Sequence, residues 1–215
     1  SAQPYISQIS LHELLSMSSG YYDGFGYPVW VNATTTQLQW MPYNFSGYFF
    51  YNNSACHLNS HLLYYATDMT PYEFANINLF PYLGIENPYW LDGYLNINDG
   101  SASLQLRLRD MVKLGQLYLQ DGWTGEEQIL SSEWIDEATS MQVETMSAIP
   151  SYGYLWWIPP DEGYMAIGFG GQYIAVYPER ELVIGIHSTI SSSQVYQSQL
   201  FNYIHSEITS VFVSE

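Results

Sequence analysis

Apolar and polar residues alternate at helical spacing over much of the first two thirds of the chain. Helices are predicted where apolar side chains recur every three or four positions, or where a capping box opens a segment. Ser10 and Glu13 form one such box, and Thr70 and Glu73 form another, with Pro71 at the first helical position. The predicted helices cover Ser10–Met17, Asn53–Thr67, a segment that opens at Thr70, Leu104–Leu119, Ser131–Thr139 and Ser191–Val211.

After Pro150 the pattern changes to short β-type runs separated by turn residues. The runs cover Tyr152–Ile158, Tyr164–Gly168, Gln172–Tyr177 and Leu182–Ser188. Helices followed by an antiparallel meander and a closing helix predict an α+β fold, in which an antiparallel sheet flanked by helices lies beside a mostly helical lobe. We therefore divide the chain into a helical lobe, residues 1–145, and a unit of strands and closing helix, residues 146–215.

The chain is strongly acidic, with 21 Asp and Glu against four Lys and Arg and a formal net charge of −17. Phosphate backbones and anionic membrane surfaces are bound by clustered Lys and Arg, so the composition excludes nucleic acid and such membranes as partners. No apolar run approaches the ~18 residues of a membrane span, so no membrane insertion is expected. The acidic surface is interpreted as solubilising, and an acidic patch for cationic substrates is the alternative.

The single cysteine and the five histidines give little sign of a metal site. Cys56 excludes an internal disulfide, and its place on the apolar side of its predicted helix favours a buried thiol over a nucleophile. His57 and His61 are one helical turn apart, a spacing that can ligate zinc, but no third ligand accompanies them. A pair on an exposed or half-buried helix face is favoured, and no cofactor is predicted.

Two polar clusters are candidates for chemistry. Tyr51-Asn52-Asn53-Ser54 stands directly before a predicted helix, and Gly168-Phe169-Gly170-Gly171-Gln172 lies between two β-type runs. Backbone N–H groups of such a glycine turn can face a developing oxyanion, and glycine lets a substrate approach closely. Taken alone, the first is more simply a packed aromatic and the second a hairpin, so their order and spacing along the chain are the stronger signal.

Six motifs in this order resemble the serine β-lactamase and penicillin-binding-protein superfamily, especially its class C-like branch with esterases and 6-aminohexanoate-dimer hydrolases. The resemblance covers essentially the whole chain. Tyr152–Trp157 is similar to the family's YGYGWW, and Gly168–Gln172 to its GHGGQ. The motifs are Ile9–Gly20, Phe49–Asn53, Asp110–Leu119, Asp121–Trp134, Tyr152–Trp157 and Gly168–Tyr177.

The resemblance implies an acyl-serine mechanism and assigns roles within both clusters. Tyr51 corresponds to the Tyr of the family's Tyr-x-Asn element, which acts as general base or acid, and Asn53 to the amide that positions lysine and substrate. Phe169-Gly170-Gly171 occupies the third motif, and the Gln172 N–H is expected to face the scissile carbonyl. A serine attacks only when a neighbouring base takes its proton, which explains why these groups must converge.

Two departures from the family pattern bear on activity. Phe169 stands where the family usually has Lys or His, which removes an anchor for a substrate carboxylate. The only lysine is Lys113, and Asp110 lies three residues before it, so these 215 residues hold no Ser-x-x-Lys. The family places that motif some tens of residues before Ile9, and we expect the first strands of the sheet and the nucleophile helix to lie upstream with it.

Two functional hypotheses follow. In the first, the chain is the C-terminal part of a serine hydrolase for a small ester or amide, inactive until an N-terminal segment or companion chain supplies Ser-x-x-Lys. The aromatic residues between Tyr21 and Tyr43 would line its pocket, with ordinary lobe packing as the alternative. In the second, the chain is a non-catalytic relative used for binding or assembly. Charge and the family's habits favour an extracellular or periplasmic location.

Overall fold

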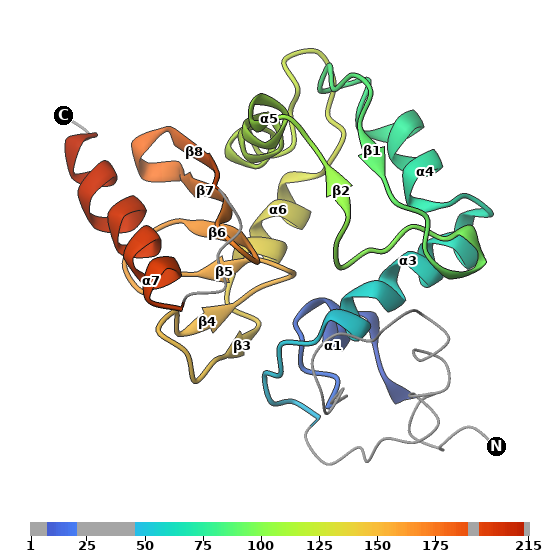
Figure 1. Cartoon of the computed structure of the whole chain (residues 1–215), viewed down its shortest axis with the longest axis horizontal. Coiled ribbons are helices and arrows are strands. Elements are labelled where there is room, and N and C mark those ends of the chain that lie inside the picture. Colours follow the sequence, from blue (N-terminus) through green and yellow to red (C-terminus); the bar gives the residue numbers. More distant parts are fainter. Residues whose placement is uncertain (1–7, 21–45, 189–193, 213–215) are drawn as a thin grey trace.

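The computed structural model of the chain describes residues 8–20, 46–188 and 194–212. Helices α1, α3 and α4 occupy one side, and an antiparallel sheet covered by α7 occupies the other, with α5 and α6 between them (Figure 1). This combination of helices and an antiparallel sheet confirms the predicted α+β fold. The aromatic residues between Tyr21 and Tyr43 lie outside the described residues, so their role in lining a pocket stays a prediction.

Capping residues set where the helices of the helical half begin. Both predicted capping boxes form, because Ser10 before α1 and Thr70 before α4 each bond reciprocally to the glutamate three residues on. The first helix ends two residues earlier than predicted, since Met17 takes a left-handed φ of 57° that a right-handed helix cannot include. The bounds are α1 Leu11–Leu15, α3 Asn53–Thr67, α4 Pro71–Asn78 and α6 Ser132–Thr139.

Helix α5 spans Leu108–Leu119, and its predicted start at Leu104 is wrong. Leu104–Gln105 forms strand β2, which pairs antiparallel with β1, Tyr89–Trp90. Leu104 packs against the cluster around Phe80, so its apolar side chain serves that cluster and not the helix face. Arg107 is the extended residue at which the helix begins.

Six antiparallel strands form the main sheet in chain order, each hydrogen-bonded to the next. Strands β6 and β7 have the predicted bounds, and β8 ends one residue early. The run predicted over Tyr152–Ile158 is two short strands, because a turn with Leu155 at a φ of 63° reverses the chain between them. The strands are β3 Val143–Glu144, β4 Ser151–Tyr152, β5 Trp157–Ile158, β6 Tyr164–Gly168, β7 Gln172–Tyr177 and β8 Leu182–His187.

One face of the sheet packs against the closing segment of the chain. Met165, Tyr173 and Tyr177 form a buried cluster with Ile204. The single helix predicted over Ser191–Val211 is irregular: α7 covers Gln194–Asn202, a π-helical turn covers Tyr203–Ile208, and a 3₁₀ turn covers Thr209–Val211. Val211 lies beyond the regular helix and is exposed.

The opposite face of the sheet packs against α5, and glycines allow the close approach. A Cβ at Gly115 of α5 would lie 2.6 Å from Val183 Cγ1 and 2.8 Å from Ile174 Cγ2. A Cβ at Gly185 of β8 would lie 2.6 Å from Val112 Cγ2. All three distances are too short for two carbon atoms, so a side chain at either position must push the helix away from the sheet.

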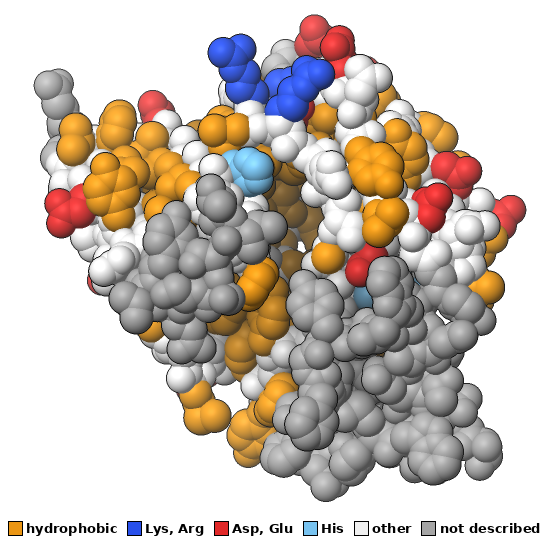
Figure 2. Space-filling model, in the orientation of Figure 1, with side chains coloured by type: hydrophobic (Ala, Val, Ile, Leu, Met, Phe, Trp, Pro, Cys, Tyr) orange, Lys and Arg blue, Asp and Glu red, His pale blue; other side chains and the backbone are white. Residues whose placement is uncertain are grey.

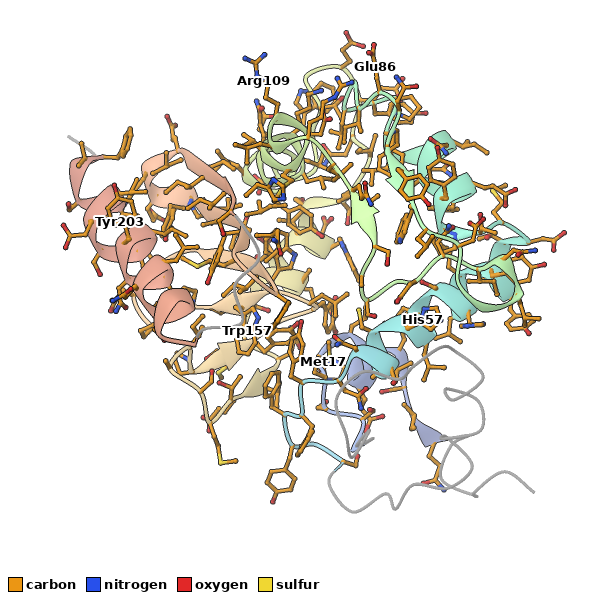
Figure 3. The ribbon with its side chains drawn as sticks, viewed as in Figure 1. Met17, His57, Glu86, Arg109, Trp157 and Tyr203 are labelled. Atoms are coloured by element: carbon orange, nitrogen blue, oxygen red, sulfur yellow. The ribbon has the colours of Figure 1, made fainter. Side chains whose placement is uncertain are left out.

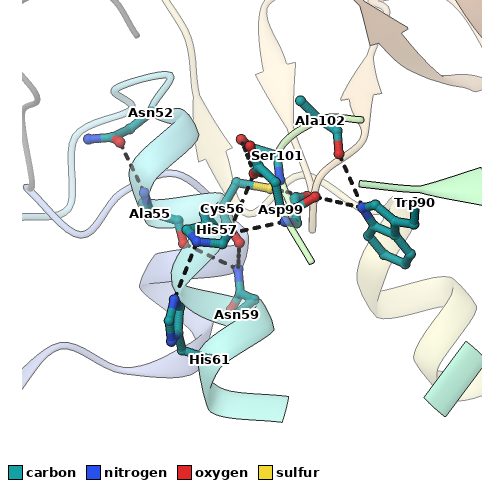
Figure 4. A network of polar contacts seen from close by, with 11 residues as sticks. Asn52, Ala55, Cys56, His57, Asn59, His61, Trp90, Asp99, Ser101 and Ala102 are labelled. Atoms are coloured by element: carbon teal, nitrogen blue, oxygen red, sulfur yellow. Dashed lines mark hydrogen bonds and ion pairs between the residues drawn. The ribbon is translucent and has the colours of Figure 1, made fainter. Parts of the chain in front are cut away.

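A buried polar network anchors the first turns of α3 (Figure 4). Asn52 is 1% exposed, and its side chain caps the helix by accepting the Ala55 N–H at 3.0 Å. One turn on, His57 Nδ1 accepts the Gly100 N–H at 3.2 Å, and the Nε2 atoms of His57 and His61 lie 3.3 Å apart. Both rings are buried, so the exposed or half-buried face predicted for them is wrong, because the loop around Gly100 lies against the helix.

The hydrogen bonds also assign protons to the histidine pair. A backbone N–H can only donate, so His57 Nδ1 is unprotonated and its Nε2–H donates to His61. Burial lowers the pKa of His57 against the opposing charge of Asp99, whose Oδ1 lies 3.4 Å from Nδ1. Burial and the neighbouring His57 lower the pKa of His61. Burial, with a contribution from Asp99, raises the pKa of the adjacent Cys56 to about 12, which fits a structural thiol.

The part of the chain that the structure describes has neither a membrane-spanning helix nor a metal-binding cluster. Within residues 8–20, 46–188 and 194–212, no helix is long and apolar enough to cross a bilayer. Across the same ranges, no three His, Cys, Asp or Glu side chains are grouped so that they could hold a metal ion. The absence of a cofactor stays a prediction.

The contact between α5 and the sheet predicts a matched pair of stability effects. Gly115→Leu is expected to lower the free energy of unfolding by about 1–3 kcal/mol, because the added side chain overpacks against Val183 and Ile174. Gln116→Leu, at the exposed neighbouring position, is expected to change it by less than about 0.5 kcal/mol. Urea unfolding followed by circular dichroism measures both, and equal effects would show that α5 does not lie on the sheet.

The histidine pair predicts a loss of stability in acid. The unfolded chain protonates its histidines below their ordinary pKa of about 6.5, while the folded chain holds His57 and His61 neutral to lower pH. The free energy of unfolding should therefore fall as pH drops below about 6.5. His57→Gln is expected to lower the free energy of unfolding by about 1–3 kcal/mol at neutral pH, because it leaves the Gly100 N–H unpaired. It should also make the fall of this free energy with pH shallower.

Unfolding titrations between about pH 8 and pH 5 measure this dependence. The control is His187→Gln, which removes an exposed histidine at the end of β8 and should leave the fall unchanged. A fall of equal steepness in wild type and His57→Gln would contradict the assignment of a buried neutral pair.

Candidate functional site

The segment that carries Tyr51 is held by the end of α1. The Gly47 N–H donates to the Ser18 carbonyl at 2.9 Å, and the Phe50 N–H donates to the Met17 carbonyl at 2.7 Å. The Asn52 N–H donates to Met17 Sδ at 3.3 Å. Met17 therefore lies close to this segment, as Figure 3 shows, and the left-handed turn that ends α1 sets the path of the chain into α3.

Aromatic rings of the sheet hold the Tyr51 side chain from the other side. Its ring stacks on Trp157 of β5 with centroids 5.8 Å apart and an angle of 15° between the planes, and its edge meets Tyr152 at 6.5 Å. Phe49 packs against the same two rings. Burial, with the nearby Tyr51 second, raises the pKa of Tyr152 far above its ordinary range. Tyr51 itself is 48% exposed, so this cluster presents one accessible phenol.

The two asparagines after Tyr51 have different surroundings. Asn52 is buried and caps α3, a structural role that the sequence analysis did not assign to it. Asn53 is the first residue of α3 and is half-buried. Its predicted role as the amide that positions lysine and substrate stays a prediction.

The glycine turn between β6 and β7 is a hairpin held against the end of β8. Gly170 and Gly171 take φ values of 87° and 97°, which favour glycine. Ser188 donates its hydroxyl to the Gly170 carbonyl at 3.0 Å and its N–H to the Gly171 carbonyl at 3.1 Å. Gln172 opens β7 opposite Gly168 on one side and His187 on the other. The predicted orientation of the Gln172 N–H toward a scissile carbonyl stays a prediction.

One cavity of about 670 Å³ brings the two predicted clusters together. Tyr51 lines it from the helical half, Gly168 and Phe169 from the hairpin, Trp157 from β5 and Phe201 from α7. Gly170, Gly171 and Gln172 are not among the described residues that line it. Figure 2 shows the molecule hollowed between the half with β6–β8 and the half with α3, with mostly hydrophobic side chains visible in the hollow.

Sequence reasoning missed Trp157 as a wall of this cavity. Trp156 directly precedes β5 and Trp157 is its first residue, and neighbouring residues of an extended chain point to opposite faces. Trp156 packs on the α5 side with Tyr118 and Tyr164, while Trp157 turns to the α7 side and Tyr51. The alternation of side-chain direction along a strand would have assigned the two tryptophans to opposite faces of the sheet, but only if the register of β5 had been known.

A chain of hydrogen bonds connects the helical half to the turn between β4 and β5. The Tyr154 hydroxyl donates its proton to Glu137 of α6 at 2.7 Å. Because that proton is used, His12 Nδ1 of α1 donates to the Tyr154 hydroxyl oxygen, at 2.9 Å. Burial and the Glu137 carboxylate raise the pKa of Tyr154 to about 12. The Leu155 N–H donates to the Leu15 carbonyl at 3.0 Å. These bonds fix α1 against the strands that carry Trp157.

The single lysine is engaged away from this cavity. Lys113 Nζ donates to the Gly84 carbonyl at 2.6 Å and to Asp110 Oδ1 at 3.0 Å. Its pairing ties α5 to the turn after α4. It is therefore a structural cation and not a partner for Tyr51.

Several solved structures are similar to this chain. A putative 6-aminohexanoate-dimer hydrolase from Bacillus anthracis has a TM-score of 0.70 and 23% identity, with 97% of this chain and 66% of that one covered. The octameric penicillin-binding protein homologue from Pyrococcus abyssi has a TM-score of 0.71, 18% identity and coverages of 98% and 58%. A class C beta lactamase from Rhodobacter sphaeroides has a TM-score of 0.67, 15% identity and coverages of 93% and 72%.

The chain thus spans between 58% and 72% of the length of these three proteins, and the TM-scores of 0.67 to 0.71 show a shared fold. A search of curated proteins finds no match. The sequence model of one family covers residues 2–206 of the chain, including both candidate clusters. Together with the fold, this match shows that the chain belongs to the beta-lactamase family.

Proposed function

We propose that the chain is the C-terminal part of a serine hydrolase that acts on a small ester or amide. The nucleophilic serine and its lysine would come from a Ser-x-x-Lys segment outside these 215 residues. The observation that carries the proposal is the cavity lined jointly by Tyr51 and by the hairpin residues Gly168 and Phe169. Membership of the beta-lactamase family supports the reaction class.

The composition of the cavity explains why a further segment is required. Its described lining residues carry no formal charge, and the only lysine of the chain is bound to Asp110 and Gly84. A serine hydroxyl attacks efficiently only when a base removes its proton, and a nearby cation favours the anionic form of a tyrosine. A Ser-x-x-Lys segment would bring both the nucleophile and that cation to Tyr51.

The proposed reaction proceeds in two displacements. The serine oxygen bonds to the substrate carbonyl carbon while its proton passes to Tyr51, and the Gln172 N–H stabilises the oxyanion. The bond from carbon to the ester oxygen or amide nitrogen then breaks, and the leaving group takes the proton from Tyr51. Water repeats the sequence on the acyl-serine, which releases the acid and restores the serine proton.

A working place outside the cytoplasm, extracellular or periplasmic, is part of this proposal. It is supported by the acidic composition and by family membership. The same family membership leaves room for a non-catalytic binding or assembly protein, which the absence of Ser-x-x-Lys from these residues favours. The experiments below separate the two functions.

The role of Tyr51 is tested with a fluorophosphonate, which labels activated serines, on protein that includes its Ser-x-x-Lys segment. Tyr51→Phe is expected to slow labelling by about 10²-fold or more, because it removes the proton-transferring hydroxyl. The substitution keeps the ring that stacks on Trp157, so the fold should persist. Tyr48→Phe, at a 71% exposed tyrosine of the same segment, should label at the wild-type rate. Unchanged labelling of Tyr51→Phe would remove Tyr51 from the mechanism.

The source of the nucleophile is tested by the chain itself. Residues 1–215 alone are expected to show no serine labelling, because they hold no Ser-x-x-Lys. Mass analysis of the labelled native protein should place the label on the added segment, and the gene should encode Ser-x-x-Lys upstream of Ser1. An initiator codon directly before Ser1, with no companion chain in the native protein, would favour the non-catalytic function.

A further inference from the structure

We propose that the cavity beside Tyr51 selects an uncharged, largely apolar acyl group and rejects a substrate that carries a carboxylate there, with Phe169 as the selecting residue. The proposal rests on the proposed function for the identity of the ligand, since the group in the cavity is taken to be part of the substrate. It adds the class of substrate, which family membership leaves open.

The walls of the cavity are mainly apolar. Aromatic rings come from Tyr51 before α3, Trp157 of β5, Phe169 of the hairpin turn, Tyr173 of β7 and Phe201 of α7. Phe169 is 61% exposed at the tip of the hairpin, so its ring is available to a ligand. A volume of about 670 Å³ lies within the range of small-molecule sites and accommodates an aromatic or medium-length aliphatic group. Burial of such a group against these rings is the main favourable contribution.

Polar groups at the cavity are few and uncharged. The hydroxyls of Ser147 and Ser198 and the amide of Asn202 belong to residues that line it. Such groups can bond to a neutral carbonyl or amide. They cannot neutralise a carboxylate. The lysine of the proposed Ser-x-x-Lys segment would be paired with the anionic Tyr51 oxygen, so a carboxylate that loses water at the Phe169 end of the cavity has no partner there and is strongly disfavoured.

The cations of the chain are engaged or placed elsewhere. Arg180 pairs with Glu162 at 2.6 Å and donates to the carbonyls of Thr209 and Phe212, beyond the end of β7 opposite to the glycine turn. Arg107, Arg109 and Lys113 lie at the start of α5, and the Lys and Arg side chains visible in Figure 2 gather at that edge. With a net charge of −17, the surrounding field also opposes an anion.

His187 is the histidine that pairs across the sheet with Gln172 beside the glycine turn. It is exposed and is not among the described residues that line the cavity.

The test is calorimetric binding of naphthalene-2-carboxamide and naphthalene-2-carboxylate, which share a skeleton and differ in charge, to the full native protein. Wild type is expected to bind the amide at least about 10-fold more tightly than the carboxylate. Phe169→Lys should reverse this order by placing a cation at the cavity mouth. Phe169→Leu, which keeps an uncharged apolar side chain, should retain the wild-type order.

Equal binding of the two ligands by wild type, binding of neither, or an unchanged order in Phe169→Lys would each overturn the proposal. Folding of the variants is checked by circular dichroism, and the exposed position of Phe169 favours it. The outcome is separate from that of serine labelling. If the protein prefers the amide but its serine is not labelled, only the hydrolase function is wrong. If labelling depends on Tyr51 but the protein shows no preference for the amide, only the assigned substrate class is wrong.

Discussion

The position of the Tyr51 ring depends on a clamp between backbone and aromatic side chains. On one side, the main-chain carbonyls of Ser18 and Met17 and the Met17 sulfur accept hydrogen bonds from residues 47–52, and on the other Trp157 stacks on the ring. Proton transfer requires a donor and acceptor within hydrogen-bond distance, so errors of about 1 Å are costly. Buried Asn52 continues the clamp by fixing the start of α3, so that one short segment is held at three successive points.

This clamp works only because the two halves of the molecule are joined close to it. The bonds that His12 donates to Tyr154, that Tyr154 donates to Glu137 and that Leu155 donates to Leu15 hold α1 and α6 against the strands that carry Trp157. The cavity draws its walls from both halves, so its shape follows their relative position. Residues far apart in the chain therefore contribute to one site. The hydrogen bonds through Tyr154 hold these residues in place together with the apolar core.

Local chemistry explains what the sequence predicted well. The capping boxes at Ser10 and Thr70 and the bounds of α3, β6 and β7 depend on residues within a few positions, so they can be predicted without tertiary information.

Leu104 was misplaced because its apolar side chain joins a cluster around Phe80 that periodicity cannot reveal. The burial of His57 depends on the distant loop around Gly100, and the part played by Trp157 depends on the register of a two-residue strand. At the candidate site, the shared cavity of Tyr51 and Phe169 agrees with the motif order, whereas the lining by Trp157 and Phe201 required the packed fold.

Strand β8 has a consequence for the behaviour of the chain in solution. Among the described strands its only partner is β7, and Leu182–Ile186 is uncharged, so a row of backbone donors and acceptors lies at the margin of the sheet. Such a margin can template pairing between copies of a protein. The acidic charge opposes that encounter, but its reach shrinks to about 8 Å at physiological ionic strength. Where no upstream strand pairs with β8, the colloidal stability of the chain is therefore a balance between edge pairing and mutual repulsion, and added salt moves that balance toward association.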